Sequence, residues 1–202
     1  NADKAGTFGT LVQMGSASTT ADSVVRHTDG SFTVVGSSSE TLSGKKVAGI
    51  TDGVIIKISK GLKITNVVRS SAVKGKRVWN SSSSTLLLGG EVIVGKKIES
   101  AITKFSAINK PVWNIRYSAK SSALVASGKN SWASFISSGP IKSVPAWKPK
   151  IPTPVVVELG KKGEALNSYK LSAPAVAMAV NSEIGTVIIT DSSVSFGFVV
   201  IN

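Results

Sequence analysis

Short apolar runs alternate with polar turns along the whole of this 202-residue chain. The runs are rich in Val, Ile and Thr, and they are bounded by Gly, Ser, Asn or Lys, as at 31–36 and 52–59. Runs of about 4 to 8 residues with this composition are typical of β-strands, whereas an amphipathic helix repeats its apolar residues every three or four positions. We therefore predict an all-β protein.

The runs belong to four recurring segments, which together predict a repeated unit. Each unit opens with one of 6–12, 61–68, 111–117 and 163–171, and continues with one of 21–29, 72–80, 121–128 and 175–183. It then has one of 31–36, 84–89, 131–136 and 185–190, and it closes with one of 52–59, 99–106, 154–160 and 198–202. The chain thus divides into four units of about four antiparallel strands, at 7–59, 61–106, 111–160 and 163–202.

Four-stranded units that repeat every ~40 to 50 residues are typical of β-propeller blades, which bury their faces by stacking on one another. We predict one β-propeller-like domain over 1–202, which stands alone or forms part of a larger ring or protein. A β-sandwich or a β-solenoid is the alternative, because serine-rich β proteins in general show evenly spaced strands.

The stretch Asp29-Gly-Ser-Phe-Thr-Val-Val-Gly-Ser37, followed by Asp52-Gly-Val-Ile-Ile-Lys-Ile-Ser59 and Gly61, resembles the blades of bacterial secreted β-propeller repeat proteins. The resemblance is clearest over 21–61 and weaker in the last two units, where Asp-Gly does not precede the closing strand. It implies a propeller fold and an extracellular or cell-surface setting, and it carries over no catalytic residue. The chain begins without an initiator Met or an apolar leader, so we expect a signal peptide to have been removed or to lie outside it.

Composition argues against several kinds of site. The chain has no Cys and only His27, so thiolate zinc sites, cysteine nucleophiles and multi-histidine metal sites are excluded. His27 comes just before an Asp29-Gly30 turn, so we expect an exposed turn residue there and no catalytic role. We find no cofactor-binding motif. The longest apolar run, 173–180, is far shorter than the ~20 residues of a transmembrane helix, so we expect no such segment.

The net charge of +13 is concentrated in the middle of the chain. Residues 41–150 carry nineteen Lys and Arg against three acids, whereas 1–40 and 151–202 have balances of −2 and −1. Because the second and third units are neighbours in a propeller, we predict one strongly basic flank. Such a flank binds an anionic polymer or serves mainly to keep a β protein soluble. Nucleic acid is a less favoured partner, because no nucleic-acid motif accompanies the charge.

Aromatic residues beside cations mark the candidate contacts on this flank, because cations bind phosphate or sulfate while a ring stacks on a base or sugar. We expect Trp113 and Trp132 to be core residues. Trp147 lies in a proline-rich loop, where it is either displayed for a ligand or packed back as an anchor. The predicted ligand-binding residues are Lys74, Lys76, Arg77, Trp79, Trp147, Lys148 and Lys150.

These observations favour a non-enzymatic, secreted or cell-surface domain of bacterial type that binds or scaffolds an anionic polysaccharide or another cell-envelope polymer. Two alternatives stay open. One is an enzyme acting on polysaccharide, which needs two carboxylates about 5 to 10 Å apart. The other is a structural domain that docks with a partner, including a second copy of itself, through an apolar face or an unpaired outer strand.

Overall fold

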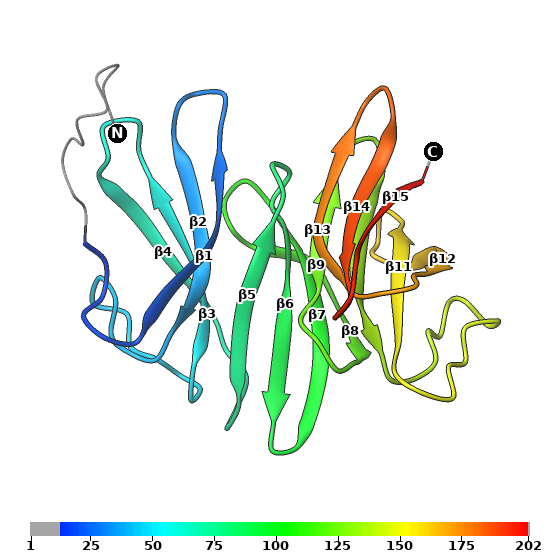
Figure 1. The fold of residues 1–202 in the computed structure, drawn as a ribbon. Coiled ribbons are helices and arrows are strands. Elements are labelled where there is room, and N and C mark those ends of the chain that lie inside the picture. Colours follow the sequence, from blue (N-terminus) through cyan, green and yellow to red (C-terminus); the bar gives the residue numbers. More distant parts are fainter. Residues whose placement is uncertain (1–12, 202) are drawn as a thin grey trace.

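The computed structural model describes residues 13–201, and within this range the chain forms strands and turns and no helix (Figure 1). The strands are β1 (Thr19–Arg26), β2 (Phe32–Ser38), β3 (Asp52–Ile58), β4 (Ile64–Ser70), β5 (Lys76–Ser82), β6 (Leu87–Val94), β7 (Lys97–Phe105), β8 (Pro111–Ser118), β9 (Leu124–Ser127), β10 (Ser131–Ser137), β11 (Thr153–Leu159), β12 (Ala165–Lys170), β13 (Ala175–Asn181), β14 (Gly185–Asp191) and β15 (Phe196–Ile201). The all-β prediction is confirmed, and each described strand overlaps a segment expected from the sequence.

These strands form four antiparallel sheets, which are the blades of a β-propeller. Their strand orders are β1-β2-β3-β4, β5-β6-β7-β8, β9-β10-β11-β12 and β13-β14-β15. We call them blades 1 to 4. Each hairpin joins strands that are neighbours in sequence, so every blade is a simple meander. The predicted propeller-like fold is therefore confirmed.

The predicted unit boundaries are wrong by one strand. The segments 61–68, 111–117 and 163–171 were expected to open a unit, but they form β4, β8 and β12, which pair with the strand before them and close blades 1, 2 and 3. The pattern of apolar positions locates a strand but does not say which neighbour it pairs with, which explains the error. Segment 6–12, the expected first copy, lies outside the described residues.

Apolar residues that alternate along the strands bury the faces between successive blades. Val35 and Ile55 of blade 1 meet Trp79 of blade 2 in one core cluster. Leu87 and Ile102 of blade 2 pack with a larger cluster on blade 3, and Trp132 of blade 3 packs against blade 4. The alternation therefore serves two faces of the same sheet, as stacked blades require.

In blades 1 and 2, the first strand has a bulge opposite a glycine of the second strand. In blade 1 the bulge follows Ala21, which lies opposite Gly36. In blade 2 the register of β5 shifts between Trp79 and Ser81, opposite Gly90 of β6. A Cβ atom on Gly90 would lie 1.9 Å from the Val78 carbonyl oxygen. Glycine is therefore required at this position by the close approach of the neighbouring backbone.

The blades contact one another in chain order. β5 packs against β1, β2 and β3, β9 packs against β5 and β6, and β13 packs against β9. Within residues 13–201, no comparable strand contact joins blade 4 to blade 1. Figure 1 shows these two blades on opposite sides of blade 2. Each of them therefore keeps one face that no other blade covers.

A search of the described residues for a helix long and apolar enough to cross a membrane finds none.

Candidate anion-binding pocket

The two lysines predicted to start the basic contact surface lie at the entry to blade 2. Lys74 is in the turn between β4 and β5, with a positive φ of 52°, and Lys76 is the first residue of β5. Both side chains are exposed. The structure therefore leaves these two cations accessible to a ligand.

Trp79 lies in the core and offers no ring face to a ligand. Its exposed fraction is 0%, and Phe105 meets the indole edge-on at a centroid distance of 6.0 Å. The Arg77 guanidinium lies over the face of the ring, 4.2 Å from its centroid. Stacking of Trp79 on a sugar or base is thus excluded by packing, and Trp79 instead supports Arg77.

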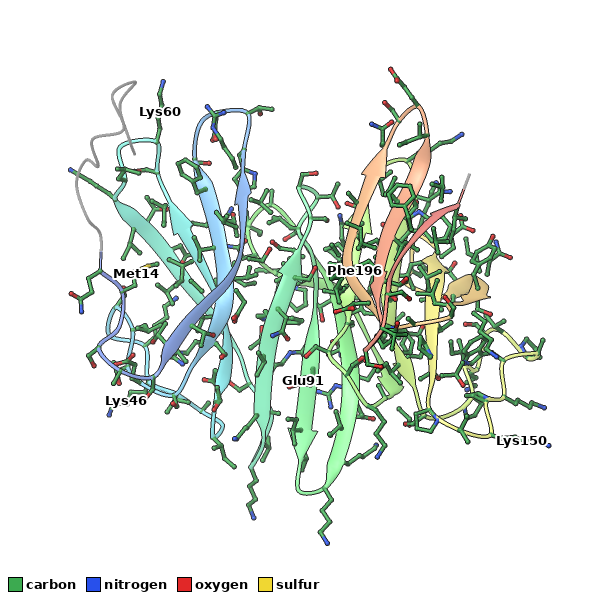
Figure 2. All side chains as sticks on the ribbon, in the orientation of Figure 1. Met14, Lys46, Lys60, Glu91, Lys150 and Phe196 are labelled. Carbon is green, nitrogen blue, oxygen red and sulfur yellow. The ribbon has the colours of Figure 1, made fainter. Side chains whose placement is uncertain are left out.

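Trp147 anchors the long loop between β10 and β11. Its side chain is half-buried against the core cluster of blade 3, and its Nε1 donates to Ser137 Oγ at 3.1 Å. The neighbouring Lys148 and Lys150 are exposed, and Figure 2 shows Lys150 at the outer edge of this loop. No hydrogen bond or ion pair of the described residues joins this loop to Lys74 or Lys76. The predicted residues therefore form two separate groups.

Arg77 is a buried cation without an acidic partner. Its side chain is 5% exposed, and its Nη2 donates to Thr103 Oγ1 at 2.9 Å and to Asn114 Oδ1 at 3.0 Å. No carboxylate lies within 4.0 Å of the guanidinium among the described residues, and the buried Nε has no hydrogen-bond partner there. Buried charges are normally paired, so this arrangement is unusual.

A pocket of about 270 Å³ lies between blades 1 and 2 and is lined by the Arg77 side chain. The other lining residues are Val68, Arg69, Ser70 and Ser71 at the end of blade 1, and Thr103, Phe105, Asn109, Pro111 and Asn114 of blade 2. They come from β4 and the β4–β5 turn, from β7 and β8, and from the β7–β8 turn. The pocket thus combines two guanidinium groups with hydroxyl and amide groups, and none of its lining residues is acidic.

Burial, and after it the positive charge of Arg116, lower the pKa of Arg77 to about 10. An arginine with free donors in a pocket can bind a carboxylate, sulfate or phosphate in a bidentate manner. Such an anion would supply the negative charge that the protein itself does not place beside Arg77. The chemistry of this pocket is therefore anion binding.

Arg69, at the rim of the same pocket, is held by the protein. Its Nη1 lies 3.4 Å from Asp52 Oδ2, and its Nε donates to the Lys45 carbonyl oxygen at 3.1 Å. Burial alone would raise the pKa of Asp52, but hydrogen bonds from Ala48 and Gly49 and the charge of Arg69 outweigh it and lower that pKa. Two neighbouring arginines thus differ in kind: one is paired and the other is not.

Sequence reasoning included Arg77 for its charge but missed the residues that make the pocket. Asn109 sits in the β7–β8 turn at a positive φ of 59°, and its buried Oδ1 has no hydrogen-bond partner in the described structure. Asn114 and Thr103 are 11 residues apart and meet only because β7 and β8 pair. These residues could be found from the sequence only if the register between β7 and β8 were known.

Two other arrangements bear on catalysis. Glu99 and Glu164 line one cleft of about 590 Å³ between blades 2 and 3. Glu99 is already bound there by Lys97 at 2.8 Å and by Arg116 at 3.6 Å.

His27 Nε2 lies 2.7 Å from Thr33 Oγ1, beside a turn that ends at Gly30. Over residues 13–201, no three His, Cys, Asp or Glu side chains gather as metal ligands would.

Comparison with known proteins adds no family to this description: no protein-family model matches the chain, and no curated protein matches it.

Proposed function

We propose that this chain is a non-enzymatic binding or scaffold domain that takes an anionic group of a polymer or glycan into the pocket at Arg77. The observation that carries the proposal is the buried guanidinium with no carboxylate partner and an unpartnered Nε. An unpaired buried cation lowers the stability of the folded protein, and a bound anion would offset that loss. The resemblance to secreted repeat proteins supports a cell-surface polymer as the source of the anion.

The surrounding charge supports a polymeric ligand over a small ion. Lys74 and Lys76 lie just before Arg77 in the chain and are exposed, so they can contact further charges of the same chain of sugars. The excess of positive charge over 41–150 attracts an anionic polymer from a distance. Trp147, Lys148 and Lys150 on the β10–β11 loop form a second, separate contact group that a long polymer can reach.

The test measures binding to a sulfated glycan, a uronic-acid polymer, a teichoic-acid-like polymer and single-stranded nucleic acid, each at two salt concentrations. The key variant is Arg77→Met, which removes the positive charge and keeps an unbranched, shorter side chain. Lys161→Met is the matched control, because Lys161 is an exposed lysine on the β11–β12 turn, outside the pocket. Lys74→Ala with Lys76→Ala, and Lys148→Ala with Lys150→Ala, test the two exposed groups.

We expect Arg77→Met to weaken binding at least about tenfold at both salt concentrations, since a charged hydrogen bond contributes roughly 1.5 to 3 kcal/mol. Lys161→Met should change affinity little. The double lysine variants should flatten the salt dependence, because each phosphate or sulfate contact releases counterions. If Arg77→Met binds every polymer as the wild type does, the pocket is not the site and the proposal fails.

Hydrolysis of polysaccharide is the second candidate, favoured by the shared cleft of Glu99 and Glu164. The pair would act as acid and base or nucleophile across a glycosidic bond. Glu164→Gln should then abolish release of reducing ends from a substrate that the wild type cleaves. Absence of cleavage by the wild type across the same polymers would reject this candidate and leave binding as the function.

A further inference from the structure

One face of blade 4 is apolar and is not covered by any other part of residues 13–201. Residues that alternate along its strands point away from blade 3 on this face, at Ala177, Ala179, Val187, Ile189, Phe196, Phe198 and Val200. Phe196 is 77% exposed and Phe198 is 66% exposed. Phe198 is the register partner of Ile189, so the exposed side chains are neighbours across strands. Contiguous apolar patches of this kind mark interaction sites.

The opposite face of blade 4 shows how such a face is covered. Met178, Val180, Ile188 and Val199 on that side pack with Trp132 and Val156 of blade 3. The two faces are therefore alike in composition, and only one of them has a blade against it. A blade that stacks on the free face would repeat the packing seen three times within the molecule.

Blade 1 also has an outward apolar face, at the other end of the series. Val24, Val34, Ile56 and Val67 form one cross-strand row on it, in which Ile56 and Val67 are already buried in a cluster with Leu42 and Met14. Val24 is 63% exposed, and Ile64 on the same sheet is also exposed. Met14 and Leu42 cover only part of this face, next to a cavity of about 180 Å³. Among the described residues, the open portion of this face that can receive another blade lies around Val24 and Ile64.

The net charges of blades 4 and 1 favour contact between the free face of blade 4 and the outward face of blade 1. Residues 175–201 contain Glu183 and Asp191 and no Lys or Arg, so blade 4 is negative. Residues 13–70 carry seven Lys and Arg against four acids, so blade 1 is positive. Blade 4 and blade 1 attract each other, whereas two copies of blade 4 would place like charges together.

We propose that two copies of this chain associate head to tail, with the free face of blade 4 of each copy on the outward face of blade 1 of the other. An interface between unlike faces forms a closed ring when its rotation closes. Two copies give a ring of eight blades, which lies within the usual range of about 4 to 8, whereas three copies would exceed it. This inference goes beyond the proposed function, because neither face contributes to the Arg77 pocket.

The test measures the mass of the full chain in solution by light scattering after gel filtration, over a range of concentrations. The chain has a mass of 20.8 kDa, and we expect the wild type to show twice that value. Phe198→Asp and Val24→Asp each bury a carboxylate in the interface and should weaken association about 100-fold or more. Val73→Asp is the control, because Val73 lies exposed in the β4–β5 turn, on neither face, and should leave the dimer intact.

A mixing experiment tests the head-to-tail geometry. Phe198→Asp keeps an intact blade 1 face and Val24→Asp keeps an intact blade 4 face, so an equimolar mixture should form dimers that neither variant forms alone. If Val24→Asp alone dimerises like the wild type while Phe198→Asp does not, blade 4 pairs with itself and the proposal is wrong. The proposal is also overturned if the wild type stays monomeric up to about 100 μM, because its self-association would then be weaker than that of specific complexes. Circular dichroism confirms that each variant is folded.

Discussion

Replacement of Arg77 by Met should make the protein more stable, because the arginine is buried as a cation without an acidic partner. Burial lowers the pKa of Arg77 from its ordinary 12.5 to about 10. At about 1.4 kcal/mol for each tenfold change in proton affinity, this is a penalty of about 3 kcal/mol on the charged form in the folded state. The penalty is present at neutral pH and is relieved only as the pH rises through about 10.

Methionine removes this penalty at a modest cost. The contact of the guanidinium with the Trp79 ring, which contributes about 1 kcal/mol, is lost. Thr103 and Asn114 keep their mutual hydrogen bond of 2.6 Å, so neither is left unpartnered. Loss of the two hydrogen bonds donated by Arg77 Nη2 also offsets part of the gain. We therefore expect a net gain of at most about 2 kcal/mol, which corresponds to a rise of up to about 4 to 8 °C in Tm for a chain of this size.

Urea unfolding at pH 7 in a chloride buffer measures the gain, since sulfate or phosphate would bind the wild type and mask it. Arg69→Met is the control, because Arg69 is paired with Asp52 and its loss leaves a buried carboxylate without its positively charged partner. That variant should lose about 3 to 5 kcal/mol. If Arg77→Met lowers the free energy of unfolding by more than about 1 kcal/mol, Arg77 is compensated by the fold, and the argument for an anion-binding pocket is refuted.

Three further predictions concern the core and its charges. Asp52→Asn should destabilise the protein by about 3 kcal/mol. Because the folded-state pKa of Asp52 is lowered, the stability that its carboxylate contributes is present above pH 3.8 and is lost as the pH falls. The Tm of the variant should therefore fall less steeply than that of the wild type as the pH is lowered. Gly90→Ala should cost about 3 kcal/mol in urea unfolding, since its Cβ would meet the Val78 carbonyl oxygen. Trp79→Ala should cost about 3 to 5 kcal/mol by calorimetry, and Trp79→Phe less than half of that, because the indole N–H it removes has no partner.

The sequence predicted the strands well because each needs only local information. The stretch 131–136, with Trp132 pointing inward, has the alternation and β-branched content of a buried strand wherever it lies in the sheet. The assignment of 61–68 to the wrong blade has a different origin. Its pairing with β3 is decided by the short turn that joins the two strands and by the register between them, and neither appears in the apolar pattern.

The candidate site was only partly predictable for a related reason. A run of basic residues beside Trp79 is consistent with an exposed patch, and Lys74 and Lys76 are indeed exposed. Yet β5 turns Arg77 and Trp79 toward blade 1, which buries both. Charged side chains are normally exposed, and this rule fails for the buried Arg77. Departures of this kind from sequence rules are expected at functional sites.

The stacking of blades strictly in chain order has a consequence for how the molecule loses structure. Within one copy of the chain, each described blade contacts only its neighbours in sequence, so a single copy behaves as a one-dimensional series with two ends. Over residues 13–201, blade 4 of a single copy is the weaker end, because it has three strands and one covered face, whereas Met14 and Leu42 shield part of blade 1. Amide hydrogens of β13, β14 and β15 should therefore exchange at a lower free energy than those of β6 and β7, and unfolding should proceed from the C-terminal blade inward.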